Sequence, residues 1–262
     1  MSEKNTAVLV VSFGTTHLDT LERCIQATEK AIGGQFPGCP VYRAFLSGIV
    51  MRRLQEKYGM HVDTVTEALE AIRRDGYSRV VIQPTLILGG IEYDLLKSKL
   101  SREQGLEIAV GRPLIMDQAD CEVMASVIME ENPLDADEAL VLMGHGTEHK
   151  ANEIYDMMQE TFTGRGYRCF LGTVEGIPSF EDAVGLLAES GASRAKLLPL
   201  MFVAGDHAKN DMAGDEDSLR TMVEAENIQA VPIIRGLGES AAVQKLYAER
   251  ARAAMEEMKW KE

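Results

Sequence analysis

The sequence predicts an α/β protein made of two similar lobes, each with a mainly parallel sheet flanked by helices. Apolar, β-branched runs alternate with segments of helical periodicity along the whole chain, which is the pattern of βαβ units. Three short motifs recur in the second half in the order of the first, which indicates a duplication. The 262 residues suffice for two domains of ordinary size, and we expect lobes at residues 1–130 and 131–262. We further expect a pseudo-twofold axis between the lobes, with a cleft there.

The first half contains strand-like runs separated by helical patterns. Apolar residues recur at helical spacing over residues 18–32 and again over residues 49–58. Thr64 and Glu67 have the spacing of a capping box and predict that another helix begins there. Pro84 indicates an edge strand, a bulge or the end of a strand. The predicted strands are residues 7–13, 41–45, 79–88 and 107–110.

The second half has the same succession of elements and similar local sequences. Its predicted strands are residues 138–143, 167–174, 194–203 and 229–234. The matching motifs are VVSFGTTH (10–17) with LMGHGTEH (142–149), YRAFL (42–46) with YRCFL (167–171), and GYSRVVIQP (76–84) with GASRAKLLP (191–199). Aligning the halves on the prolines of the last pair matches Phe13 with His145 and Glu92 with His207. We therefore expect Glu92 to face the two histidines from the opposite lobe.

Composition excludes several classes of function. A formal net charge of −14 argues against a surface for nucleic acid or anionic membranes, both of which require clustered Lys and Arg. No apolar run approaches the roughly 20 residues that a membrane span needs, and the N-terminus lacks the apolar stretch of a signal peptide. The four cysteines are scattered without C-x-x-C spacing, which predicts reduced thiols in a cytoplasmic protein. A homo-oligomer remains possible.

Two histidines stand where predicted strands end, His145 in MGHGTEH and His207 in PLMFVAGDHAKNDM. In open α/β sheets, ligands bind in the crevice beyond the carboxyl ends of the strands. Imidazole accepts protons near neutral pH and ligates divalent metals, so two such groups indicate metal handling, proton handling or both. The alternative is two unrelated turn histidines. Gly144 and Gly146 allow backbone or a flat ligand to approach His145, and Thr147 is expected to hold the loop or cap the next helix.

Carboxylates follow the same strands. Glu175 ends a strand-like run in GTVEGIP, and two imidazoles with one carboxylate suit a divalent first-row metal. Taken alone, Glu175 is better interpreted as a solvated turn carboxylate, and the two histidines favour the ligand interpretation. Asp206 and Asp211 flank His207, where a carboxylate would fix the tautomer of the ring. Loops that bind nucleotides and the G-x-S-x-G of serine hydrolases are missing, and the other histidines, His17, His61 and His149, are interpreted as surface residues.

The motifs VVSFGTT, MGHGT, GTVEGIP and LPLMFVAGDHAKNDMAGDE, with FLSGIVMRRL (45–54) and the closing RGLGE (235–239), together resemble the anaerobic sirohydrochlorin cobaltochelatases. This branch of the class II tetrapyrrole chelatases is related in fold to ferrochelatase, so the resemblance implies two Rossmann-like lobes. It also implies a lyase-class chelatase that inserts Co(II) into sirohydrochlorin or precorrin-2, without a nucleotide, in anaerobic cobalamin biosynthesis. By the same resemblance, His145, Glu175 and His207 hold the cobalt, and Glu92 is a carboxylate of the cleft.

Metallation of a tetrapyrrole requires the ion to lose water and to displace two pyrrole N–H protons. His145 is expected to accept one proton and Glu92 to relay the second. Contacts to the tetrapyrrole are expected from the loop after the first strand and from the turn before Glu92; the residues are Ser12, Phe13, Gly14, Thr15 and Gly90.

Three points remain open from the sequence. The metal is cobalt by resemblance, with iron or nickel as alternatives, and a non-catalytic carrier of metal or tetrapyrrole is the alternative from another class. The carboxylates of sirohydrochlorin require positive charge, for which Arg43, Arg52, Arg53 and Lys209 are available. The chain departs from the family pattern at Leu86, near which related sequences carry a histidine.

Overall fold

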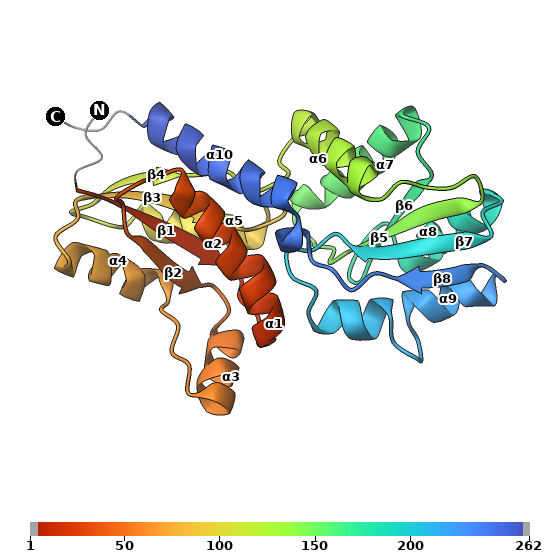
Figure 1. Cartoon of the computed structure of the whole chain (residues 1–262), viewed down its shortest axis with the longest axis horizontal. Coiled ribbons are helices and arrows are strands. Elements are labelled where there is room, and N and C mark those ends of the chain that lie inside the picture. Colours follow the sequence, from red (N-terminus) through yellow and green to blue (C-terminus); the bar gives the residue numbers. More distant parts are fainter. Residues whose placement is uncertain (1–4, 259–262) are drawn as a thin grey trace. The chain divides into compact units, whose positions relative to one another are not determined.

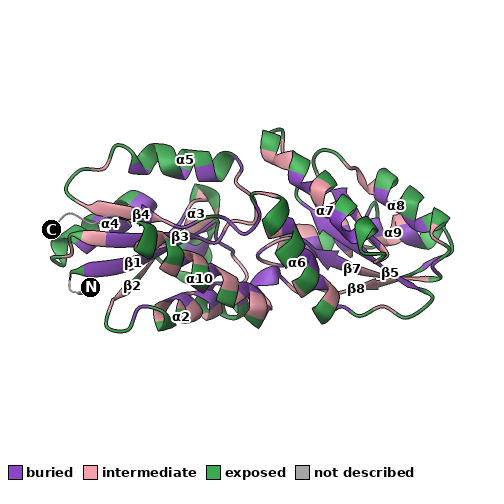
Figure 2. Cartoon of the chain, turned by 90° about the horizontal axis from the view of Figure 1, so that it is seen from above, coloured by how far each residue is buried: buried purple, intermediate pink, exposed green. Residues whose placement is uncertain are grey.

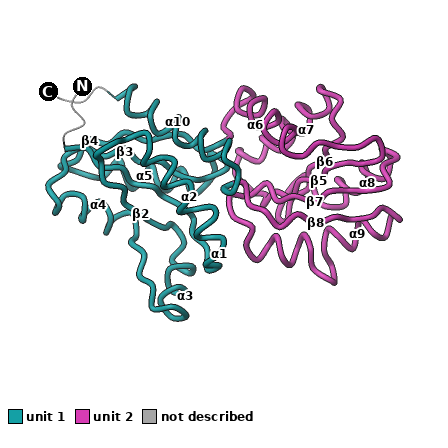
Figure 3. Tube along the Cα trace, in the orientation of Figure 1, with its two compact units in different colours: residues 1–114, 238–262 teal, residues 115–237 magenta. Residues whose placement is uncertain are grey.

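The structure is a computed structural model that describes residues 5–258 (Figure 1). The chain forms two compact units, one of residues up to Leu114 together with those from Gly238 on, the other of Ile115–Leu237 (Figure 3). This division differs from the predicted lobes at 1–130 and 131–262. Helix α6 (Gln118–Glu131) packs against α7 (Glu153–Gly164), and α10 (Ala241–Glu257) packs against α2 (Ala27–Gly34). Local sequence patterns do not reveal these packing partners, so the compact units and the predicted lobes have different bounds.

The first unit is a four-stranded parallel sheet with strand order β2-β1-β3-β4. Its strands are β1 (Thr6–Ser12), β2 (Val41–Phe45), β3 (Arg79–Pro84) and β4 (Glu107–Val110). Its helices are α1 (Leu18–Thr20), the π-helical turn η1 (Leu21–Gln26), α2, α3 (Gly48–Tyr58), α4 (Val65–Arg74), α5 (Ile91–Leu100) and α10. The capping box of Thr64 and Glu67 at the start of α4 is confirmed.

The second unit is a parallel sheet with strand order β6-β5-β7-β8. Its strands are β5 (Glu138–Gly144), β6 (Cys169–Thr173), β7 (Arg194–Pro199) and β8 (Gln229–Pro232). Its helices are α6, the 3₁₀ turn η2 (Lys150–Asn152), α7, α8 (Phe180–Glu189), the π-helical turn η3 (Ala208–Met212) and α9 (Leu219–Ala225). A further 3₁₀ turn, η4 (Leu237–Glu239), lies where the chain returns to the first unit.

The two sheets have the same strand order, which confirms the predicted repeat. β1 and β5 occupy the same place in their sheets, so residues 7–13 and 138–143 are equivalent first strands. The equivalence extends to the strand ends: the N–H of Leu46 donates to the carbonyl of Ser12, and the N–H of Val174 donates to the carbonyl of Gly144. Each unit therefore carries the same loop at the carboxyl end of its first strand.

The strands form the interior of each unit. Every residue of β1 and β5 is buried, as expected for parallel strands covered on both faces. Figure 2 shows buried residues concentrated on the strands, whereas the helices carry exposed residues on their outer sides. In α4, for example, Val65, Ala68 and Leu69 are buried at helical spacing. Amphipathic helices thus close both cores.

Two predicted strands end earlier than expected, because proline lacks the N–H that continues a ladder. The run 79–88 ends at Pro84 and the run 194–203 ends at Pro199. Pro84 lies on an inner strand between β1 and β4, so of the three possibilities the strand end is confirmed. The residues beyond these prolines form the loops that lead to Glu92 and His207.

The cysteines are all free, in agreement with the prediction of reduced thiols. Burial raises the pKa of Cys24 to about 12 and that of Cys121 to about 11, which keeps both thiols protonated at neutral pH. Over residues 5–258, no helix is both long enough and apolar enough to cross a bilayer.

Candidate metal site in the second unit

His145 follows β5 directly and is held by its own loop. The strand is anchored by the buried Met143, whereas the side chain of His145 is exposed. Nδ1 of His145 lies 3.0 Å from the carbonyl oxygen of Gly146. A carbonyl can only accept, so Nδ1 carries the proton and the lone pair of the neutral ring is on Nε2. Nε2 is the atom available to a metal or a proton.

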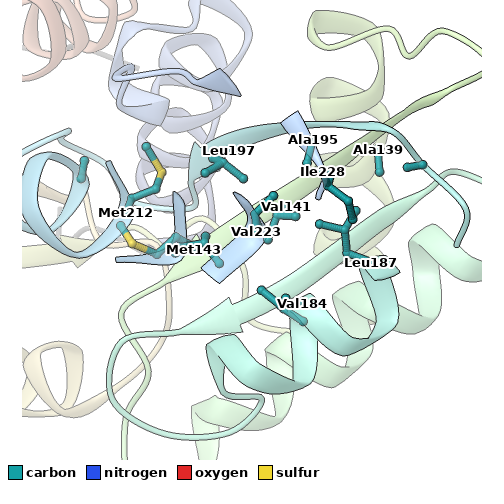
Figure 4. Packing of buried hydrophobic residues seen from close by; sticks show 14 of the residues in the cluster. Ala139, Val141, Met143, Val184, Leu187, Ala195, Leu197, Met212, Val223 and Ile228 are labelled. Carbon is teal, nitrogen blue, oxygen red and sulfur yellow. The ribbon is translucent and has the colours of Figure 1, made fainter. Parts of the chain in front are cut away.

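His207 is positioned by the turn η3 that it precedes. Ala208 and Met212 of η3 are buried in the core cluster that also contains Met143 of β5 (Figure 4). On the other side of the turn, Nδ1 of His207 lies 2.7 Å from a carboxylate oxygen of Asp211. The carboxylate accepts the Nδ1 proton, so the lone pair of His207 is also on Nε2.

The two imidazoles lie in contact. Their ring centroids are 4.9 Å apart and the ring planes are nearly perpendicular, at 87°. His145 and His207 are therefore not unrelated turn residues but one pair at the carboxyl end of the sheet of the second unit. In its neutral form, each imidazole of the pair has its Nδ1 occupied and a lone pair on Nε2, so the pair is a candidate for two of the ligands of a first-row metal.

Glu175 joins this pair through its backbone. Its N–H donates to the carbonyl of His145 at 2.8 Å, while its side chain is exposed. In the part of the chain that the structure describes, only His61, Asp63 and Glu67 bring three ligand atoms within 4.8 Å of one another. The carboxylate of Glu175 therefore does not complete a closed three-ligand set in this conformation, and its role as a ligand stays a prediction.

The group formed by His61, Asp63 and Glu67 is explained by helix capping. A carboxylate oxygen of Glu67 accepts the N–H of Thr64 at 2.8 Å, and Nε2 of His61 lies 3.0 Å from Asp63. His61 is a surface residue, as the sequence indicated, with 70% of its side chain exposed. These contacts give the group a structural role at the start of α4.

The glycines beside His145 allow protein atoms, rather than a ligand, to come close. A Cβ on Gly144 would lie 2.3 Å from the ring of Tyr155, and one on Gly146 would lie 1.6 Å from the carbonyl oxygen of Glu175. The buried hydroxyl of Tyr155 accepts the N–H of Gly146 at 3.2 Å, and burial raises the pKa of this phenol. Sequence reasoning missed Tyr155, although the glycines on either side of His145 indicated a close approach.

Thr147 has one of its two expected roles, whereas His149 has a role that the sequence did not indicate. The hydroxyl of Thr147 accepts the N–H of His149 at 3.1 Å, so Thr147 holds the loop and does not cap a helix. The cap of η2 is His149, whose Nδ1 accepts the N–H of Ala151 at 3.1 Å. Because the Nδ1 lone pair is used in this way, the neutral ring carries its proton on Nε2. His149 is not a third metal ligand in this conformation.

A pocket of about 680 Å³ adjoins the loops of His145 and Glu175. Four carboxylates line it, and Lys150 is the lysine among its lining residues. The carboxylates are Glu148, Glu153, Asp156 and Glu175. A concave surface with excess negative charge attracts cations and raises their local concentration. The electrostatics of this side of the site thus favour a divalent cation.

Known proteins similar to this chain are metal chelatases. Residues 6–256 match the family model described as cobalt chelatase (CbiK). The chain belongs to this cobalt chelatase family. It is 34% identical over 253 residues to the sirohydrochlorin cobaltochelatase of Salmonella typhimurium, covering 95% of this chain and 96% of the relative. It is 30% identical over 255 residues to the sirohydrochlorin cobaltochelatase CbiKC of Nitratidesulfovibrio vulgaris, covering 95% and 90%.

The fold of this cobalt chelatase is also that of a solved chelatase. SirB from Bacillus subtilis, solved with Fe³⁺, superposes with a TM-score of 0.63 at 16% identity, covering 95% of each chain. At that identity the likeness concerns the fold alone. It confirms the predicted architecture of Rossmann-like lobes with parallel sheets.

The first unit of the cobalt chelatase carries the residues expected to contact a tetrapyrrole. Ser12 is buried and accepts the hydroxyl of Thr85 at 2.8 Å, and the buried Thr15 accepts the N–H of His17 at 3.2 Å. Phe13, by contrast, is 48% exposed. Of the expected side chains in this loop, Phe13 is the one presented to solvent, and the assignment of the loop stays a prediction.

Two features of the first unit have counterparts in the second unit: the glycine in the loop after β1, and the turn before α5. Gly14, like Gly146, has a positive φ, here 103°, and a Cβ would lie 2.6 Å from the ring of Phe45. Gly90 is the N-cap of α5, and Glu92 lies exposed in its first turn. Glu92 follows Pro84 at the same interval as His207 follows Pro199, and each begins a helical segment. Gly14 and Gly146, and likewise Glu92 and His207, therefore occupy corresponding positions of the two units.

The basic residues expected at the substrate differ in availability. Both nitrogens of the Arg43 fork donate to Glu29 at 2.6 Å, and this pairing raises the pKa of Arg43. Its charge is thereby balanced inside the first unit. Arg52 and Arg53 on α3 and Lys209 on η3 are exposed.

Replacing Gly146 with alanine is expected to destabilise the protein by about 2–4 kcal/mol, since φ is 84° and the added methyl would meet the carbonyl of Glu175. Unfolding in urea measures this loss. Gly164→Ala is the matched control, because nothing lies within 4 Å of that position in α7. Equal urea midpoints for the two variants would show that Gly146 is not required for the loop.

Proposed function

We propose that this protein inserts Co(II) into sirohydrochlorin. The observation that carries the proposal is the contact of His145 and His207, in which both Nδ1 atoms are occupied and both Nε2 atoms are Lewis bases. Membership of the cobalt chelatase family and the names of the two relatives support the choice of metal and tetrapyrrole.

The histidine pair suits both halves of the reaction. Co(II) is the substrate metal; it exchanges water for the two imidazoles and then for the four ring nitrogens, while two pyrrole protons leave. An imidazole that has released the metal has a lone pair on Nε2, which accepts one of these protons. Asp211 then stabilises the protonated ring of His207. Two ligands on an exposed site bind the ion weakly enough to release it.

The other expected residues take roles that support this step. Glu175 completes the ligand set when its exposed side chain turns toward the imidazoles, and Glu92 accepts or relays the second proton. Arg52 and Arg53 supply charge for the carboxylates of the tetrapyrrole, because Arg43 is balanced by Glu29. No nucleotide takes part in this scheme, and the cytoplasm remains the expected location.

A metallation assay tests the proposal. Purified protein with sirohydrochlorin and Co(II), without ATP, should convert the absorbance of the free tetrapyrrole to that of the metallated form faster than the protein-free reaction. Fe(II) and Ni(II) are assayed in parallel under anaerobic conditions, with a slower rate expected for both. Binding of sirohydrochlorin without an accelerated change on adding Co(II) would identify a carrier and overturn the proposal.

A further inference from the structure

The end of the turn η2 and the first turn of α7 contact the two loops that carry His145 and Glu175. The loops run side by side at the carboxyl ends of β5 and β6, where Val174 and Glu175 donate to the carbonyls of Gly144 and His145 at 3.1 and 2.8 Å. The carbonyl of Pro178 accepts both the N–H and the hydroxyl of Thr173, which closes the second loop on itself. Each loop is ordered by backbone contacts, and side chains from the start of α7 then join them.

Asn152 forms the connection between the loops. Its Oδ1 accepts the N–H of Thr147 at 3.1 Å, and its Nδ2 donates to the carbonyl of Ile177 at 2.5 Å. Thr147 lies two residues after His145, and Ile177 lies two residues after Glu175. One amide therefore uses its acceptor on the first loop and its donor on the second. Gly176 leaves room for it, since a Cβ there would lie 3.3 Å from Oδ1.

Tyr155 fixes the first loop from the inside. Its buried hydroxyl accepts the N–H of Gly146, the residue between His145 and Thr147. With this loop held by Tyr155, the bond from Asn152 to Ile177 sets the place of the second loop relative to it. The hydrogen bonds of Asn152 concern only the two loops. Farther along α7, Gln159 contacts strand β6 itself, through Cys169 and Leu171.

We propose that Asn152 is a positioning residue for the metal: its amide couples the loop of His145 to the loop of Glu175, so that both side chains serve one ion. This inference rests on the proposed function and on Glu175 as a ligand. Replacing a residue that orients the metal ligands without binding the metal itself typically lowers metal affinity by about 10–100-fold. Loss of the connection should therefore appear in Co(II) affinity even without a tetrapyrrole.

Asn152→Asp separates positioning from charge. The carboxylate keeps an acceptor for the N–H of Thr147, but it places an acceptor against the carbonyl of Ile177 and breaks that bond. The added negative charge alone would tighten Co(II) binding, whereas the lost connection should weaken it by about 10-fold. The two explanations predict opposite signs.

Gln159→Glu is the matched control, because Gln159 lies on α7, the helix of which Asn152 is the N-cap. The amide of Gln159 makes the same kind of connection, donating to the carbonyl of Cys169 at 2.8 Å and accepting the N–H of Leu171 at 3.0 Å. These contacts lie on β6 itself, away from the two loops. The substitution makes the same change of amide to carboxylate, and it should leave Co(II) affinity unchanged.

The experiment is a titration of the full chain with Co(II), in which the visible absorption of the bound ion reports binding. It compares the wild type with four variants: Asn152→Asp, Gln159→Glu, Glu175→Gln, and the double variant that combines Asn152→Asp with Glu175→Gln. We expect weaker binding in Asn152→Asp and in Glu175→Gln, and no further loss in the double variant. Asn152→Ala removes both bonds without adding charge and should behave in the same way if the aspartate variant folds poorly.

Three results would overturn the inference: affinity in Asn152→Asp equal to that in Gln159→Glu, tighter binding, or losses that add in the double variant. Activity distinguishes its failure from that of the proposed function. If the wild type inserts cobalt while Asn152→Asp has an unchanged KM for Co(II), the connection is irrelevant and the chelatase stands. If the wild type inserts no cobalt while the Co(II) titration shows the coupling, the proposed function fails and the coupling stands.

Discussion

Replacing either His145 or His207 with alanine is expected to abolish cobalt insertion while leaving the fold intact. Each variant removes one of the two Nε2 donors, and with it an acceptor for a pyrrole proton. Loss of a positioned base alone lowers rates by about 10²–10⁴-fold, and loss of a ligand adds to that. The core should be unaffected, because His145 is exposed and 42% of the side chain of His207 is exposed.

The initial rate of metallation and the thermal unfolding midpoint measure the two parts of this prediction. His61→Ala is the control, since it removes an exposed histidine from the first unit and should metallate at the wild-type rate. Turnover at the wild-type rate in either site variant would refute the assignment of the pair. A large fall in the unfolding midpoint would show instead that the residue supports the fold.

Replacing Glu92 with glutamine is expected to lower the rate of cobalt insertion by about 10²–10⁴-fold. The amide keeps the shape of the side chain but cannot take a proton. Binding of the tetrapyrrole, measured by fluorescence quenching, should change much less, because the amide fills the same space. Glu92 lies in the first turn of α5, where the helix dipole favours a carboxylate, at the position that corresponds to His207.

Asp94→Asn is the matched control for Glu92. Asp94 lies in the same first turn and pairs with Lys97 at 2.9 Å, so its replacement removes the same charge from the same helix end. We expect the control to retain the wild-type rate. A full-speed Glu92→Gln variant would make Glu92 a solvated carboxylate of the helix end and would leave the second proton to another group.

Much of the fold could be predicted because its signals are local. The strands are short runs of apolar residues, and in β1 and β5 every residue is buried. The repeat was visible because the ends of the first and third strands of each sheet carry similar motifs; the YRAFL and YRCFL motifs overlap equivalent strands but do not lie at equivalent positions of the ladders. The bounds of the compact units could not be predicted, because they depend on long-range packing, α6 on α7 and α10 on α2, which no local pattern encodes.

The candidate site divides in the same way. His145 and His207 could be predicted because each follows a strand, and the topology of a parallel sheet brings such ends together. Asn152 and Tyr155 could not be predicted, since their roles arise from hydrogen bonds between a helix and loops that are separate in sequence. The carboxylate beside His207 was expected from the sequence and is Asp211, whereas the partner of Nδ1 in His145 is a backbone carbonyl, which no local pattern indicates.

The placement of both imidazoles, and of the groups that orient them, has a consequence for how such a chain evolves. His145, His207, Asp211 and the contacts from α7 all belong to residues 115–237. Substitutions elsewhere in the chain leave these contacts untouched. On the proposed assignment of the metal ligands to this unit and of the tetrapyrrole contacts to the first unit, preference for a cation and preference for an organic substrate can change through separate substitutions.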